Sequence, residues 1–210
     1  ISFLIVMLGF YLGTIQGLNT SSAKFIAIGR ITGIIATFAV LFEVLILSRM
    51  PFIEKNFNLE QIIQLHRYNG FVIIFAIVAH AVFITYGYAL QTSSGLLSQF
   101  VSLNTDFEDV LYATIGTVIF FVITVTSLKF LRKKIPYEIW FFTHVLVYGA
   151  ILLASLHQVN SGFDFVTQDW LKYYWIFLYA AVFGLLAWYR FIRPFYYFLS
   201  YDFKVLKIVK

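Results

Sequence analysis

The stretch LHRYNGFVIIFAIVAHAVFITYG, from Leu65 to Gly87, decides the fold. It is long and apolar enough to cross a bilayer, which requires about 20 mostly apolar residues. It nevertheless contains His66 and His80. Ionisable side chains at membrane depth are costly unless a partner compensates them. The stretch therefore predicts a membrane-spanning helix whose two histidines have bound partners.

The rest of the chain is equally apolar. Of its 210 residues, 61% are hydrophobic and 20% aromatic, and the mean hydropathy is +0.86. Soluble domains need more charge than this to cover their surface. Basic segments interleaved with exposed aromatics are missing, so we expect no nucleic-acid partner. The lack of Cys excludes disulfides, iron–sulfur clusters and thiolate-ligated haem. We expect an all-α membrane protein whose partner is the lipid bilayer.

Six apolar stretches separated by polar segments are long enough, or nearly so, to span the membrane. If the first begins in the cytoplasm, twelve of the fifteen Lys and Arg residues lie on the cytoplasmic side and three outside. This distribution follows the positive-inside rule. We therefore predict a six-helix, multi-pass protein of the plasma membrane with both termini cytoplasmic. The predicted spans are Ile1–Leu18, Phe25–Ser48, Tyr68–Leu90, Val110–Leu128, Tyr137–Val159 and Trp170–Ile192.

The last ten residues, YDFKVLKIVK, differ in character from the spans. Their alternation is typical of a short β-strand, and a strand is not stable alone. They predict either the start of a soluble domain that this chain lacks or a frayed amphipathic end. We divide the chain into a membrane domain, 1–199, and the beginning of a cytoplasmic domain, 200–210.

The four histidines fall into two pairs, on the third and fifth predicted spans. His66 and His80 are fourteen residues apart, about 21 Å along a helix and on nearly the same face. Gly70, one turn from His66, leaves room for a flat ligand. His144 and His157 are thirteen apart, so a straight helix would turn them about 140° from each other. We expect a tightened 3₁₀ end at SLHQVNSG to bring His157 back to the same face.

Because the third and fifth spans run in the same direction, one histidine from each should meet at each of two levels. Two facing imidazoles suit a b-type haem iron with histidine at both axial positions, whereas zinc would need further ligands. The alternative is a set of core histidines bonded to hydroxyls or carbonyls. No phosphate-binding glycine loop, HExxH motif or nucleophilic triad is present.

The motifs HRYNG…AH on the third span and H…LH on the fifth resemble the ferric reductase and NADPH oxidase superfamily of transmembrane haem proteins. The resemblance covers essentially the whole chain. It implies an inner haem b held by His66 and His144 and an outer haem b held by His80 and His157. It also implies that a cytoplasmic domain binding FAD and NAD(P)H follows the last span.

The resemblance extends to Arg30 in IGRITG, because the family places an arginine near the outer haem. It departs from the family at Ile84, where animal oxidases often carry a further histidine. The implied oxidoreductase passes electrons from NAD(P)H and flavin through both haems to an external acceptor. The acceptor is either oxygen, giving superoxide, or a ferric chelate. Arg30 is the candidate catalytic residue, through a haem propionate or developing superoxide, and simple snorkelling is the alternative.

Other polar residues have less specific expected roles. We expect Arg67 beside an inner propionate and Tyr148 either lining the gap between haems or packed as an ordinary aromatic. Glu43, within the second span, requires a polar partner. The cationic cluster either docks the flavin domain or only sets topology; its members are Arg132, Lys133 and Lys134.

Two other functions remain open at this point. One is a standalone haem subunit feeding a periplasmic enzyme, similar to the membrane component of the methionine sulfoxide reductase system. That family tends to carry Arg at the position of His66, which argues against it. The other is a transporter whose histidines carry protons. The number of haems per chain distinguishes all three functions.

Overall fold

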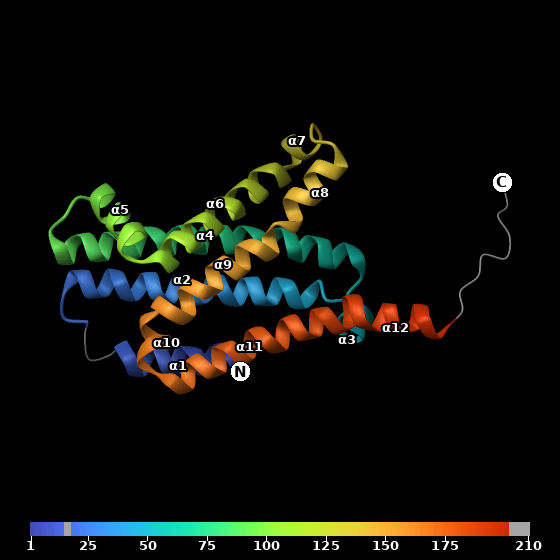
Figure 1. Ribbon diagram of the computed structural model, residues 1–210, viewed down its shortest axis with the longest axis horizontal. Coiled ribbons are helices and arrows are strands. Elements are labelled where there is room, and N and C mark those ends of the chain that lie inside the picture. The colour runs from blue at the N-terminus through green and yellow to red at the C-terminus, as the bar shows by residue number, and fades with distance from the viewer. Residues whose placement is uncertain (15–17, 202–210) are drawn as a thin grey trace.

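The computed structural model describes residues 1–14 and 18–201, and all the regular structure in these ranges is helical. Figure 1 shows long helices along the longest axis of the molecule and other long helices crossing them obliquely, with short helices at both ends. The helices are α1 (Ser2–Thr14), α2 (Ser21–Ile46), α3 (Pro51–Asn56), α4 (Leu59–Thr92), α5 (Leu96–Asp106), α6 (Glu108–Ser127), α7 (Lys129–Arg132), α8 (Tyr137–Val145), α9 (Val147–Ser161), α10 (Phe163–Thr167), α11 (Asp169–Ala187), η1 (Trp188–Ile192) and α12 (Arg193–Ser200).

Within the described ranges, five helical segments are long and apolar enough to cross a bilayer. The second to sixth predicted spans fall on these segments, so the prediction of an all-α membrane protein is confirmed. The first predicted span overlaps α1, whose apolar part, Ser2–Tyr11, is shorter than a full span. Whether the first predicted span crosses the membrane, which would make six spans in all, therefore stays a prediction. The strand predicted in the tail lies outside the described residues. The five segments are Ser21–Ile46, Leu59–Thr92, Asp109–Ser127, Tyr137–Ser161 and Asp169–Ser200.

The central element is an antiparallel pair formed by α2 and α4, which lie side by side over their length (Figure 1). At one end the Ser22 hydroxyl donates to the Gly87 carbonyl at 2.8 Å. At the other end Glu43 contacts His66. The helix α4 is 34 residues long, or about 51 Å. It begins at a capping box in which Asn58 and Gln61 exchange hydrogen bonds, a device that satisfies two free amides of the first turn.

Glycines allow the backbones of α2 and α4 to approach closely. Gly29 and Gly33 form a G-x-x-x-G motif on α2, and Gly87 lies on α4. A Cβ atom on Gly29 would lie 2.9 Å from the Ile84 amide nitrogen, and one on Gly87 would lie 2.9 Å from the Ile26 amide nitrogen. Small residues at such spacing are typical of membrane helix pairs, which associate through close packing.

A second antiparallel pair, α6 with α8 and α9, lies across the first (Figure 1). Asp109 at the start of α6 accepts hydrogen bonds from Asn160 and Ser161 at the end of α9. Ser127 at the end of α6 contacts His144 in α8. His66 and then His80 on α4 face His144 on α8 and then His157 on α9, so α8 and α9 run in the same direction as α4.

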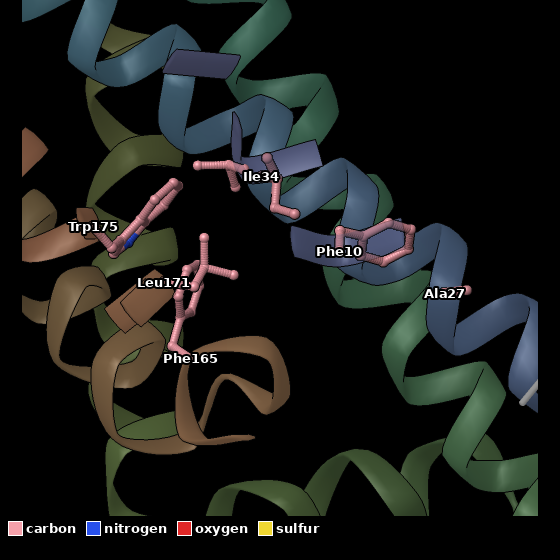
Figure 2. Packing of buried hydrophobic residues seen from close by; sticks show 7 residues of the cluster. Phe10, Ala27, Ile34, Phe165, Leu171 and Trp175 are labelled. Carbon is pink, nitrogen blue, oxygen red and sulfur yellow. The ribbon is translucent and has the colours of Figure 1, made fainter. Parts of the chain in front are cut away.

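Two apolar clusters hold the bundle together. The first joins α1, α2, α10 and α11, and Figure 2 shows Trp175, Phe165 and Leu171 facing Ile34 and Phe10. The second joins α2, α4, α6, α9 and α11; its buried members are Val40, Val44, Ile73, Phe120, Ala150, Ile151 and Leu186. Because each cluster contains side chains from several helices, the clusters fix the positions of these helices relative to one another.

The fifth span is interrupted between its two histidines. At Leu146, between α8 and α9, the amide bonds to the Thr143 carbonyl three residues back. The helix α9 then continues in α-helical form through His157 to Ser161. The prediction of a 3₁₀ end at His157 is therefore wrong. The change of phase comes from the break at Leu146, where one turn is tightened in the middle of the span.

Candidate functional site

The structure brings the four histidines together as two pairs. The ring centres of His66 (α4) and His144 (α8) lie 5.9 Å apart, with an angle of 68° between the rings. The ring centres of His80 (α4) and His157 (α9) lie 6.2 Å apart, at 57°. The pairs are separated by about 21 Å along α4. The first pair joins α4 to α8 and the second joins α4 to α9, and α8 and α9 run in the same direction as α4.

These separations match two imidazoles on opposite sides of one metal ion. A metal–imidazole bond is about 2 Å long and a ring nitrogen lies about 1.2 Å from its ring centre, so coaxial ligands have ring centres about 6.4 Å apart. Both observed distances are within 0.5 Å of this value. The role of the four histidines as haem ligands nevertheless stays a prediction.

On α4, both rings are oriented through Nδ1. Nδ1 of His66 lies 2.5 Å from Oε1 of Glu43, and Nδ1 of His80 lies 2.8 Å from the Gly29 carbonyl oxygen. Both partners can accept a hydrogen from Nδ1, an arrangement that in the neutral ring leaves the lone pair on Nε2 free for a metal. This hydrogen bond is typical of ligating histidines, because it fixes the tautomer and the ring orientation. Glu43, whose partner the sequence does not reveal, is therefore paired with His66.

His144 and His157, which face the two histidines of α4, have other contacts than His66 and His80. The His144 ring centre lies 5.0 Å from that of Trp140, with the rings tilted by 30°, and its Nδ1 lies 3.4 Å from the Ser127 hydroxyl. Nδ1 of His157 is buried and has no hydrogen-bond partner among the described residues. Buried polar atoms are rarely left unpaired. His157 is therefore a buried imidazole whose hydrogen bonding the described residues leave incomplete, and its ring centre lies 6.2 Å from that of His80.

Gln158, next to His157, fixes the position of α9. Its side-chain amide donates to the Thr37 hydroxyl at 2.8 Å. Its carbonyl oxygen accepts from Trp175 at 2.9 Å and from Tyr179 at 3.0 Å. These contacts join α9 to α2 and α11. Sequence reasoning missed this residue, although a Gln at membrane depth beside a candidate ligand is a usable signal.

An apolar layer separates the two pairs. Ile73 lies seven residues from each histidine on α4 and packs in the second cluster with Ala150 and Ile151. Nearer to His66, a Cβ atom on Gly70 would meet no atom within 4 Å. The same holds for Gly149 on α9. There is therefore space for a flat ligand beside the half-buried Gly70, whereas Gly149 is exposed.

Arg30 has a protein partner that the sequence does not indicate. Its Nε donates to Oδ2 of Asp164 at 2.9 Å, and its Nη2 forms an ion pair with Oδ1. Its guanidinium also lies 5.0 Å from the ring centre of Phe10 and 4.6 Å from that of Phe163. Arg30 follows Gly29, the partner of His80, so this ion pair lies at the level of the His80–His157 pair. It joins α2 to α10.

The remaining predicted residues lie apart from these contacts. Arg67 is exposed on α4, and Tyr148 is 41% exposed near the start of α9. Arg132 lies 4.4 Å from the ring centre of Trp140 and donates to the Ile135 carbonyl. It is therefore linked through Trp140 to His144, while Lys133 and Lys134 are exposed. The roles expected of these residues stay predictions.

Five helical segments long and apolar enough to cross a bilayer define a multi-pass membrane protein, and two histidine pairs lie at two levels among them. The chain belongs to the ferric reductase-like transmembrane component family, whose model matches residues 32–155. It is therefore an oxidoreductase-type membrane component. The match includes His66, His80 and His144 and ends two residues before His157. No curated protein and no solved structure matches the chain significantly.

Proposed function

We propose that the chain carries electrons across the membrane through two b-type haems, from a cytoplasmic FAD and NAD(P)H domain to an acceptor outside. The observation that carries this proposal is the pair of facing rings at each of two levels, with centres 5.9 and 6.2 Å apart. The family match supports it, because the matched component belongs to reductases. The acceptor is oxygen, giving superoxide, or a ferric chelate.

In this proposal His66 and His144 hold the inner haem, and His80 and His157 hold the outer one. A haem with histidine on both sides supplies a one-electron carrier with no open coordination position. The protein's task is then to orient the rings, to leave room beside Gly70 and to exclude water between the levels. Ile73 lies in that dry layer.

At the outer level, Arg30 is the candidate catalytic residue. A cavity of about 650 Å³ is lined by Arg30 and Phe163 together with polar side chains that include Ser22 and Gln91. A cationic group at its wall favours an anionic ligand or developing superoxide. Asp164 holds the guanidinium in place and compensates its charge in the absence of such a ligand.

At the inner level, the proposal names the surface on which the cytoplasmic flavin domain would dock and the residue that would bind a haem propionate. Positive charge on Lys133 and Lys134 is exposed beside the His144 end of the bundle, and this position suits docking of the flavin domain. Arg67, exposed one residue after His66, suits a propionate at that level. Both termini are cytoplasmic in this arrangement, as the distribution of Lys and Arg favours.

The number of haems tests the function directly. Purified chain assayed as the pyridine haemochrome should contain two b haems, and reduced flavin domain or dithionite should reduce both. One haem per chain would favour a standalone subunit feeding a periplasmic reductase. A chain without haem would overturn the proposal and leave a transporter.

Gly33 offers a separate test of the outer site. A Cβ atom there would lie 2.7 Å from Nδ1 of His80, so Gly33→Ala should push the ring off the Gly29 carbonyl. We expect loss of at least half of the outer haem, measured by haem content, with the inner haem retained. Gly184→Ala is the matched control, since a Cβ on Gly184 meets no atom within 4 Å. Equal haem content in both variants would contradict the prediction.

A further inference from the structure

A buried polar network surrounds the carboxylate of Glu43 on α2. Oε1 accepts from His66 at 2.5 Å, and Oε2 accepts from the Asn69 amide at 2.6 Å. The same Asn69 amide donates to the Ala39 carbonyl at 2.8 Å. Glu43 is only 9% exposed. Both hydrogens of the Asn69 amide are thus used, and the carboxylate is held in one orientation.

The two histidines of α4 therefore face acceptors of different charge. His66 donates to a carboxylate, whereas His80 donates to the neutral Gly29 carbonyl. A negatively charged acceptor draws the Nδ1 hydrogen toward itself and increases the electron density that Nε2 can donate to a metal. Near the other pair, Asp164 is neutralised by Arg30. Asp109 accepts hydrogen bonds from Asn160 and Ser161 and not from His80 or His157, so the direct hydrogen bond to a carboxylate is what distinguishes His66.

We propose that Glu43 is a positioning residue that lowers the reduction potential of the haem at His66 and His144 below that of the other haem. This inference rests on the proposed function. A more electron-donating ligand stabilises ferric over ferrous iron, and so does a nearby negative charge in a medium of low dielectric constant. The lower potential stands at the cytoplasmic level, so electrons entering there pass to a carrier that holds them more strongly.

A merely structural role for Glu43 would have different consequences. In that case the carboxylate would serve only to join α2 to α4 through Asn69, and its replacement would change stability but not potential. The test must therefore measure the potential of each haem separately. The pyridine haemochrome gives the haem content. A redox titration followed at the optical α-band gives the midpoint potential of each haem.

The main variant is Glu43→Gln, which keeps the shape and removes the charge. We expect two haems per chain, a raised midpoint for the inner haem and an unchanged midpoint for the outer haem. In a His80→Ala background only the inner haem remains, which assigns the shifted midpoint. Asn69→Ala is the matched control, because it removes the second contact of Glu43 but keeps the carboxylate against His66.

Each outcome decides the inference. Wild-type chain without haem overturns the proposed function and this inference together. Two haems with an unmoved inner midpoint in Glu43→Gln, or equal shifts in Glu43→Gln and Asn69→Ala, overturn the inference alone. If Glu43→Gln loses the inner haem, Glu43→Asp decides: it keeps the charge, so a retained low midpoint supports the inference. An inner midpoint in Glu43→Asp equal to that of the outer haem contradicts it.

Discussion

Replacing His80 by Ala should leave one b haem per chain instead of two and reduce electron transfer to the external acceptor to background. His80 and His157 face each other with no third histidine at their level, so neither can be substituted by a neighbour. The inner haem should remain, because His66 and His144 lie about 21 Å away along the helix. Haem content, and acceptor reduction in proteoliposomes, measure both effects.

The reciprocal variant, His144→Ala, should lose the inner haem and keep the outer one. Phe75→Ala is a suitable control on α4, because Phe75 is 71% exposed and belongs to neither pair. It should retain both haems and normal transfer. Retention of two haems in His80→Ala and in His144→Ala would refute the assignment of the ligands.

Asp164→Asn should be the most destabilising single substitution of a charged residue outside the histidine sites. It leaves the Arg30 guanidinium, only 15% exposed, without its counter-charge. Removing one member of a buried ion pair costs about 3–5 kcal/mol, since the other charge remains buried and unpaired. The free energy of unfolding in detergent should fall by this amount.

Two further variants control this measurement. Asp169→Asn changes an exposed carboxylate at the start of α11 and should change the free energy by less than about 0.5 kcal/mol. The double variant Arg30→Leu, Asp164→Leu removes both charges and should recover most of the loss. A loss in Asp164→Asn no greater than in Asp169→Asn would show that the ion pair contributes little to stability.

Periodicity and composition were sufficient to predict the class of fold. Apolar length predicts the spans from the second to the sixth, because a bilayer imposes one dimension on every helix that crosses it. The boundaries were less accurate. The third span begins nine residues before the predicted Tyr68, at Leu59, because the capping box at Asn58 starts the helix in the polar segment.

Contacts between distant segments could not be predicted in the same way. Arg30 and Asp164 are 134 residues apart, and nothing in the local sequence of either specifies the other. The break at Leu146 has no Pro or Gly at the site, although Gly149 follows three residues later. The next residue after the break, Val147, packs against the second apolar cluster, a contact between distant segments that periodicity does not describe. The spacing of His66 and His80, by contrast, is a property of one helix, so their common face was expected from sequence. The phase of His157 relative to His144 depends on the break at Leu146 and was predicted by the wrong device.

The depth of the two histidine levels on α4 has an electrical consequence. Their separation of about 21 Å is roughly two thirds of the hydrocarbon thickness of about 30 Å. An electron that moves between them therefore crosses most of the membrane voltage, which is worth about 1.6 kcal/mol per 100 mV over that fraction. In the proposed function, with the cell interior negative, this voltage would drive the electron outward, and each turnover would lower the voltage. Sustained activity then requires a compensating flow of cations through another route.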